Sequence, residues 1–564
     1  MNSDICFAVR SSLGISVNYG PAKFSSNDAF NAVLSKSCRT MLFSPAGEYF
    51  AYVNGLNLHL LLTEGWKDIA VIQNTKSYHL SFSPMGTYLC TWEPFVTNNA
   101  NPQGTPNLNI YESKSGKPIK SFVHKKQTNW EPQWSSDEAL FSRLVDTDVV
   151  FYDLNDFNIV NRIKSFKVAS YTVSPNIGTY FILLHTQEGK GNPSIGRLFK
   201  YPLFEHQQSI ATKSFFQADK VEFYWSVKAI HVLLLTMTEV DKTSYYGKQG
   251  LHFISTNGDT AIVTMNKEGP IYNVAWSPKD TEFCVVYGYM PSRCTIFNLK
   301  CESIHQFSAA PRNSIYYNPQ GNILLLAGFG NLRGHIELWD VTSKKLIGSC
   351  EAPDSTLLQW SPDGTHFLTA TTAPRLRIGN GYKIWHYSGV IIHEHPYSEG
   401  DELYDVSWQK VPKDRFKEPI VNFQKVEGIV SNQPQASKEA YRPPSARNRP
   451  PVKFKLHDDD SDGQLPPAAP SKAALKQKKK RDNKKAARKQ QDEAHSDPPI
   501  TSTVSVILTE DEEKNKKIKN IKKKLDAIAK LKEQQSQGKV LEVNQLAKIK
   551  SEDELKNELK QLQL

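Results

Sequence analysis

The stretch "FSPAGEYFAY" runs from Phe43 to Tyr52, and a related stretch, "WSPDGTHFLTA", runs from Trp360 to Ala370. In Ser-Pro-x-Gly, serine suits the first position of a type I turn, proline fixes φ at the second, and glycine accepts a left-handed conformation at the fourth. Apolar and aromatic residues flank both copies in the pattern of β-strands. Each copy therefore predicts a tight turn between two antiparallel strands.

The same turn recurs along the first three quarters of the chain. Aligned on the serine, or on the asparagine that replaces it, successive copies lie 39 to 52 residues apart. A period of roughly 40 to 45 residues is typical of a propeller sheet of four short strands. The copies at Ser135 and Ser226 are degenerate, and the Ser226 unit fits the pattern least well. The nine copies begin at Ser44, Ser83, Ser135, Ser174, Ser226, Ser277, Asn318, Ser361 and Ser407.

The repeat predicts an all-β fold, a single nine-bladed WD-type β-propeller over residues 1–424. Two rings of four and five sheets are the alternative, but no linker separates them. Trp339-Asp340 is a WD dipeptide, and we expect the aromatic residues to pack between sheets. The early stretch "ICFAVR" (5–10) is expected to complete the sheet that begins near Trp408, because closure of the ring removes an exposed edge.

Composition changes near residue 420. All ten tryptophans fall between Trp66 and Trp408, whereas residues 421–564 contain only three aromatic residues. This C-terminal part carries 31 Lys and Arg against 21 Asp and Glu, a net charge of +10, which leaves +1 for residues 1–420. We therefore expect a flexible Pro-rich and Lys-rich linker over 425–508 and a basic helical region over 509–564. Basic arms of this kind usually meet phosphate or other acidic surfaces.

A dense basic run lies inside the linker. Between Lys472 and Gln491, ten Lys and Arg are accompanied by a single acid, and no aromatic residue is interleaved. The run therefore favours contact with an RNA backbone or a ribosome over base stacking. The alternatives are a nuclear-localisation-like run or a solvated tether. The candidate contact residues are Lys478, Lys479, Lys480, Arg481, Lys484, Lys485, Arg488 and Lys489.

The helical region begins with a capping box at Thr509 to Glu512. Apolar residues then recur at three- and four-residue spacing, and a second apolar stripe follows Gly538. Neither stripe can be buried within one isolated helix, so the two helices either pair as a hairpin or dock on a partner. The candidate partner helix face is formed by Ile518, Ile521, Leu525, Ile528 and Leu531.

Four segments, two in the repeats and two in the tail, carry a family resemblance. They are "FGNLRGHIELWDV" (329–341), "TAPRLRIGNGYKIWHYSG" (372–389), "AYRPPSARNRP" (440–450) and "KKIKNIKKKLDAIAKLKEQQSQGK" (516–539). They resemble segments of the eukaryotic translation initiation factor 2A family. The resemblance implies a nine-bladed propeller with a helical C-terminal region, GTP-independent binding of initiator methionyl-tRNA to the small ribosomal subunit, and initiation under stress.

Two of these segments hold arginines in loops of neighbouring sheets. Both loops are expected between the second and third strands, so Arg333, Arg375 and Arg377 should form one basic patch on a single face. The planar guanidinium donates two parallel hydrogen bonds to a phosphate. The alternative is that these arginines only pair with nearby acids or loop carbonyls.

Motifs for catalysis are missing from the sequence. It contains neither G-x-x-x-x-G-K-[ST] nor G-x-S-x-G, and the seven cysteines show no zinc spacing. His393-Glu394-His395 lies in a strand-like stretch, where its histidines are expected on one side of a sheet. We expect no catalytic residue, cofactor or metal. A propeller-bearing hydrolase is the disfavoured enzymatic alternative.

The remaining expectations concern partners and location. The cysteines are expected to be reduced, buried thiols, and the sequence shows neither a leader pattern nor an apolar run of membrane length, which together favour the cytoplasm. The implied partners are the small ribosomal subunit and initiator tRNA, with mRNA and other initiation factors as further candidates. We expect a monomer that does not bind membranes. The main alternative is a scaffold propeller that assembles proteins or membrane surfaces without RNA.

Overall fold

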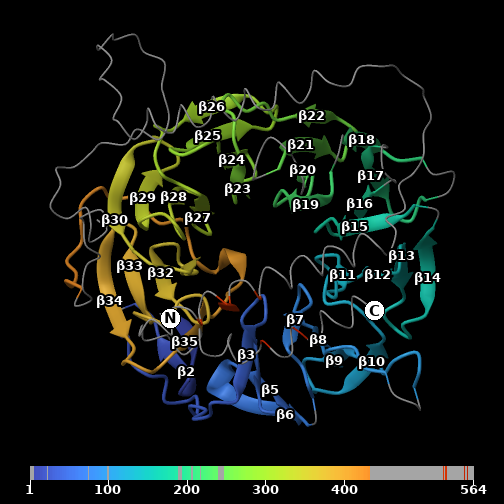
Figure 1. The fold of residues 1–564 in the computed structure, drawn as a ribbon, viewed down its shortest axis with the longest axis horizontal. Coiled ribbons are helices and arrows are strands. Elements are labelled where there is room, and N and C mark those ends of the chain that lie inside the picture. The colour runs from blue at the N-terminus through green and yellow to red at the C-terminus, as the bar shows by residue number, and fades with distance from the viewer. Residues whose placement is uncertain are drawn as a thin grey trace. The chain divides into compact units, whose positions relative to one another are not determined.

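The computed structural model describes residues 5–431, except 22, 74, 98–100, 165, 188–192, 205–207, 216–217 and 239–246, together with Leu525, Ile528, Ala529, Lys532, Glu552 and Lys556. Residues 1–441 and 442–564 form two compact units. In the first unit, the described residues form nine antiparallel sheets arranged as a ring around a central axis (Figure 1). The prediction of a single nine-bladed β-propeller is confirmed.

Eight of the described sheets have four strands, each paired with the next along the chain. The first strand of each sheet lies toward the axis and the fourth lies toward the rim (Figure 1). The first four contain β3 (Cys38–Phe43), β4 (Tyr49–Asn54), β5 (Asn57–Leu62) and β6 (Lys67–Ile72); β7 (His79–Phe82), β8 (Tyr88–Trp92), β9 (Leu108–Glu112) and β10 (Pro118–Phe122); β11 (Gln133–Trp134), β12 (Phe141–Val145), β13 (Asp148–Tyr152) and β14 (Ile159–Ile163); and β15 (Val168–Val173), β16 (Phe181–Thr186), β17 (Ser194–Lys200) and β18 (Ala211–Phe215). The next four contain β19 (Lys220–Trp225), β20 (His231–Met237), β21 (Gln249–Ser255) and β22 (Thr260–Ile262); β23 (Ile271–Trp276), β24 (Glu282–Tyr287), β25 (Arg293–Asn298) and β26 (Ser303–Gln306); β27 (Ser314–Tyr317), β28 (Ile323–Ala327), β29 (His335–Asp340) and β30 (Leu346–Glu351); and β31 (Leu357–Trp360), β32 (His366–Thr371), β33 (Gly381–His386) and β34 (Val390–Pro396).

The ninth sheet joins the two ends of the ring. It contains β35 (Leu403–Trp408), β1 (Cys6–Ser11) and β2 (Gly14–Tyr19), and β1 runs antiparallel to β35 with Phe7 opposite Trp408. The predicted closure by "ICFAVR" is therefore confirmed. Because β1 already takes the place of the second strand, β35 needs no turn after it.

The ninth predicted turn, at Ser407, is wrong for the same reason. Ser407 lies inside β35 and is paired with Ala8 of β1. The chain then continues past Trp408 into the segment that follows, instead of reversing. An isolated serine in a strand resembled a turn only because the flanking residues continued the repeat.

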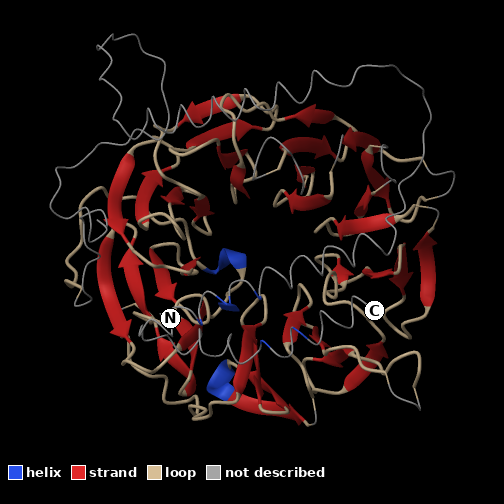
Figure 2. Cartoon of the chain, in the orientation of Figure 1, coloured by secondary structure: helices blue, strands red, loops and turns tan. Residues whose placement is uncertain are grey.

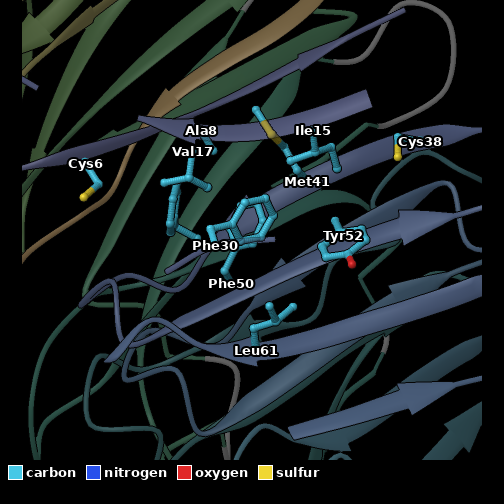
Figure 3. Close-up of a cluster of buried hydrophobic side chains, with 11 residues drawn as sticks. Cys6, Ala8, Ile15, Val17, Phe30, Cys38, Met41, Phe50, Tyr52 and Leu61 are labelled. Carbon is cyan, nitrogen blue, oxygen red and sulfur yellow. The ribbon is translucent and has the colours of Figure 1, made fainter. Parts of the chain in front are cut away.

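Side chains fill the space between neighbouring sheets. Between the closing sheet and the β3–β6 sheet, Phe30, Met41 and Phe50 are almost fully buried (Figure 3). Trp66 of the short helix η1 (Glu64–Trp66) packs edge-to-face on Phe30, with ring centroids 5.1 Å apart. The expected packing of aromatic residues between sheets is confirmed here, and the buried apolar area supplies the main stabilisation of each contact.

The turns between first and second strands all lie on one face, which we call the turn face. In the eight turns that form, the leading serine or asparagine is buried. At Ser44, for example, Oγ accepts a hydrogen bond of 3.0 Å from the amide of Tyr49, which begins the second strand. Later in the turn, φ is positive at Gly47 and equally at Glu138 and Ala229, where glycine is missing. The degenerate copies thus keep the same left-handed conformation.

The opposite face, which we call the loop face, carries the connections between second and third strands and those between consecutive sheets. The described chain after β35, residues 409–431, crosses the turn face as a strap. The Gln409 side chain donates to the Gly47 carbonyl at 2.9 Å, and Glu418 of the strap forms a 3.0 Å ion pair with Lys279, which lies in the β23–β24 turn of a distant sheet. Between these two contacts, the short helix η3 (Lys413–Arg415) lies over the centre of the ring (Figure 2).

The strap ends at the rim of the β31–β34 sheet. The Ile429 amide donates to the Ile391 carbonyl of β34 at 2.8 Å. Further on, Ser431 Oγ donates to Glu394 at 2.7 Å and accepts from Lys383 Nζ at 2.9 Å. The strap therefore passes from the turn face toward the loop face along the outer edge of this sheet.

Candidate nucleic-acid interface

The loops that carry the three predicted arginines lie side by side on the loop face. Residues 328–334 connect β28 to β29, and residues 372–380 connect β32 to β33 of the next sheet (Figure 1). Both connections join second to third strands, as the sequence predicted.

Arg375 reaches from its own loop to the neighbouring one. Its Nη2 lies 3.2 Å from the position that a Cβ would occupy at Gly330, where φ is +75°. A side chain at Gly330 would be strained and would push against this guanidinium. Arg375 and Gly330 also line a cavity of about 180 Å³, together with Phe329 and Thr356. The two predicted loops are therefore brought together by contact.

The other two arginines differ in their surroundings. Arg333 is exposed on the 328–334 loop. Arg377 Nε lies 3.4 Å from Glu402 Oε1, with 69% of the arginine side chain exposed. Pairing with an acid, the alternative reading, is thus observed for Arg377. Such an exposed pair contributes little stability, so the guanidinium can exchange Glu402 for another anion at low cost.

Asparagine side chains directly before strands fix these loops, a feature that sequence reasoning missed. Asn313 donates from Nδ2 to the Phe329 carbonyl at 2.8 Å and accepts from the Phe329 amide at 3.0 Å. Asn380 donates to the Leu376 carbonyl at 2.8 Å and accepts from the Leu403 amide at 2.8 Å. An amide side chain can satisfy a donor and an acceptor together, so one residue holds the loop base in place. The signal was available as an asparagine directly before a strand in "NSIYY" (313–317) and "NGYKIW" (380–385).

The histidines of His393-Glu394-His395 lie on β34, as predicted. His393 stacks on Phe24 with ring centroids 4.6 Å apart, and His395 stacks on Tyr382 at 5.3 Å. Burial lowers the pKa of both histidines, which favours their neutral, stacked forms. Within the described ranges, no cluster of three or more His, Cys, Asp or Glu residues could hold a metal ion.

The expectation of buried cysteines holds for most of them. All seven are free; five are buried, and Cys301 and Cys350 are half-buried. Burial raises the pKa of Cys301 to about 11 and that of Cys350 to about 12, so both thiols are protonated at neutral pH.

Most of the predicted tail residues lie outside the described residues. These are Lys478, Lys479, Lys480, Arg481, Lys484, Lys485, Arg488 and Lys489 of the basic run, and Ile518, Ile521 and Leu531 of the partner helix face. Leu525 and Ile528 are helical, and Ile528 is buried. Lys532 forms an ion pair with Glu552, which also pairs with Lys556 at 2.8 Å. The Lys532–Glu552 ion pair joins two helical residues that lie twenty positions apart in the sequence.

The fold and these loops define a β-propeller with arginine-bearing loops on one face. A family profile described as "Eukaryotic translation initiation factor eIF2A" matches residues 213–406. The chain is 45% identical to eukaryotic translation initiation factor 2A of Drosophila melanogaster over 73% of this chain and 67% of the relative. It is 31% identical to the factor of the same name from Caenorhabditis elegans over the full length of both.

A solved structure agrees with these relatives. The "Crystal structure of the eukaryotic initiation factor" superposes with a TM-score of 0.67 and 32% identity, covering 73% of this chain and all of that chain. The chain belongs to the eukaryotic translation initiation factor 2A family, and so to the translation initiation factors rather than to a known enzyme family. In the part of the chain that the structure describes, no helix is long and apolar enough to cross a bilayer.

Proposed function

We propose that this protein binds the small ribosomal subunit and initiator methionyl-tRNA in the cytoplasm without using GTP. The observation that carries the proposal is the contact between the 328–334 and 372–380 loops, in which Arg375 approaches Gly330, with Arg333 and Arg375 both exposed on these loops. Guanidinium groups on pinned loops suit phosphates held in a fixed arrangement, as in folded RNA.

The two parts of the chain have different roles in this proposal. The pinned loops of the propeller orient the bound RNA. The basic run from Lys472 to Gln491 raises encounter rate and affinity through sequence-independent contacts with phosphates. The absence of a P-loop motif from the sequence agrees with action that does not depend on GTP.

Co-sedimentation with purified small subunits at increasing salt tests the proposal. The full chain should bind at low salt equally well with and without GTP, and lose affinity as salt rises. Residues 1–471 should bind at least about tenfold more weakly and with a flatter salt dependence, because the phosphate contacts of the tail are gone. No binding by the full chain at low salt would reject the ribosomal role. Equal affinity and slope for the truncated chain would reject the role of the tail.

A second candidate function is protein scaffolding through the same loop. Ile378, beside Arg377, is 90% exposed, and Leu376 is also exposed. Apolar side chains projecting from a cationic loop can enter a pocket of a partner protein. In that case Ile378→Ser would weaken capture of ribosomal proteins while leaving tRNA binding unchanged.

A further inference from the structure

A second cationic site lies on the loop face, far from the arginine loops. A cavity of about 490 Å³ opens between the β10–β11 connection, the β12–β13 turn and the start of β15. Its size is within the range of sites for small ligands, roughly 300 to 1,000 Å³. Lys125, Lys126 and Arg143 line it, together with apolar residues such as Val168.

Arg143 is an unusual part of this lining. It is 5% exposed, and its guanidinium carbon lies 4.1 Å from the centre of the Phe122 ring. Nη2 donates to the Val123 carbonyl at 3.2 Å, but Nε is buried without a hydrogen-bond partner. Among the residues that the structure describes, no carboxylate forms an ion pair with Arg143. The partners of this buried guanidinium, the Phe122 ring, the Val123 carbonyl and the Tyr152 hydroxyl, carry no negative charge, and an anion in the cavity would supply one.

The two lysines are held near this guanidinium by a pinned connection. The Asn107 side chain donates to the His124 carbonyl at 2.9 Å and accepts from the His124 amide at 2.7 Å. Trp92 Nε1 donates to the same carbonyl at 3.3 Å, and Trp130 is buried at the other end of the connection. Lys125 and Lys126 follow His124 directly and are exposed. The ends of the connection are therefore fixed, while both ammonium groups remain open to a ligand.

One acidic side chain also lines the cavity. Asp146, in the β12–β13 turn, is exposed and has a positive φ of 55°. Against Lys125, Lys126 and Arg143 it leaves the lining cationic. Its carboxylate should repel a bound anion. Removal of this charge should therefore strengthen anion binding, whereas removal of a lysine should weaken it.

We propose that this cavity binds a phosphate group of a single-stranded RNA segment, with Lys125, Lys126 and Arg143 around the phosphate and the apolar lining beside the sugar. The proposal rests on the proposed function, because it takes the bound RNA as the source of the phosphate. The β11–β14 and β27–β34 sheets lie on opposite sides of the ring (Figure 1). RNA that contacts both the cavity and the arginine loops therefore extends across the loop face.

The test is fluorescence anisotropy of the full chain with a labelled single-stranded RNA of twelve nucleotides, over a range of salt. Lys125→Ala combined with Lys126→Ala should weaken binding about tenfold at low salt and reduce the salt slope by up to about 0.7, the contribution of one single-strand phosphate contact. Both lysines are exposed, so the change leaves the core intact. Asp146→Asn should tighten binding two- to threefold, by removing one like-sign repulsion of the phosphate of roughly this size.

The matched control is Lys114→Ala combined with Lys117→Ala. These exposed lysines lie in the β9–β10 turn of an adjacent sheet, on the turn face, and their removal changes net charge equally. The control pair should leave affinity and slope unchanged. An equal loss in both pairs, or no loss in the Lys125 and Lys126 pair, would overturn the cavity site.

Two further arms separate the possible outcomes. Adenosine monophosphate and inorganic phosphate, added as competitors, should displace the labelled RNA only weakly; displacement as effective as that by unlabelled RNA would identify a free nucleotide as the ligand and overturn the RNA assignment. Crosslinking of 4-thiouridine RNA should label the peptide around residues 123–132 whatever the tail contributes, and labelling confined to other peptides would reject the site. If the wild-type chain co-sediments with small subunits but shows no such label, the cavity site alone is rejected. If the chain does not co-sediment either, the proposed function is rejected as well.

Discussion

The two faces of the ring are built from opposite ends of the same strands, yet the connections on one face repeat from sheet to sheet and those on the other do not. On the turn face, seven of the eight turns share one hydrogen-bond pattern and the Ser174 turn is two residues longer, and buried side chains such as those of Ser44 and Asn318 close them. On the loop face, connections between second and third strands range from the two-residue turn at Asp146 and Thr147 to residues 93–107. The comparison teaches that repeated residues specify the architecture, while residues that occur once carry the candidate binding groups.

The largest expected effect is on stability and belongs to the turn face. Asn318 is fully buried; its Oδ1 accepts from the amides of Asn322 and Ile323, both at 3.0 Å. Asn318→Ala should lower the free energy of unfolding by about 3 kcal/mol, because two buried amides lose their acceptor. Urea denaturation followed by tryptophan fluorescence measures this loss.

The control for Asn318 is Asn331→Ala, an exposed asparagine on the loop face. It should change stability little. The RNA affinity of folded Asn318→Ala protein should equal that of the wild type. A stability loss below about 1 kcal/mol, or weaker RNA binding by the folded variant, would contradict the division between the faces.

The next effect is a pH dependence at another repeated turn. Burial alone would raise the pKa of Asp363, but hydrogen bonds from His366, Ser361 and Thr365 outweigh it and lower the pKa to about 2. Because the folded-state pKa lies below the unfolded value of about 3.9, this stabilisation is present above about pH 4 and is lost as the pH falls toward 2. Asp363→Asn should cost up to about 2 kcal/mol at pH 6, and its difference from wild type should shrink toward pH 2.

Chemical denaturation at several pH values measures that difference. Glu399→Gln, an exposed change on the loop face, should follow the wild-type profile. A gap between Asp363→Asn and wild type that stays constant from pH 6 to pH 2 would show that the carboxylate does not act through its charge.

The smallest effect in free energy is on binding and belongs to the loop face. Arg333→Ala combined with Arg375→Ala should weaken binding to small subunits about tenfold, or about 1.4 kcal/mol, and leave unfolding nearly unchanged. Arg375→Lys keeps the charge but loses the planar fork, so its single effect should lie between wild type and Arg375→Ala. Co-sedimentation at fixed salt gives the order.

Arg377→Ala provides the comparison within the same loop. Because Arg377 is paired with Glu402, its removal should cost only two- to threefold in affinity, as expected for an arginine that must first leave its partner. A larger loss for Arg377→Ala than for the Arg333 and Arg375 pair would move the contact surface to the 377–402 side of the loop.

The turns and the ring could be predicted from the sequence because each turn depends on residues that are close together in the chain. The Ser-Pro-x-Gly copies are recognisable as turns by themselves, so their spacing indicated the degenerate copies and the ring of sheets, and the apolar stretch at 5–10 was the natural strand to close it. Ser407 failed because its local pattern could not show that β1, almost four hundred residues earlier, already occupied the neighbouring position.

The candidate site was less accessible to such reasoning. Sequence placed Arg333, Arg375 and Arg377 on neighbouring loops, but the approach of Arg375 to Gly330 and the pairing of Arg377 with Glu402 depend on three-dimensional contacts. The cavity around Arg143 combines residues from three connections, and nothing in "HKK" (124–126) indicates which arginine lies beside it. The partners implied by the tail stay predictions.

The route of the strap also decides where the rest of the chain is tethered. Ser431 is held by Lys383, which lies two residues after Gly381, the start of β33 and the end of the 372–380 loop. The residues that follow are thus tethered at this rim, and the effective concentration of whatever they bind depends on the length of chain from this tether. Removing the strap and joining the tail directly to β35 would move the tether point to Trp408. This would change that effective concentration without altering any contact residue.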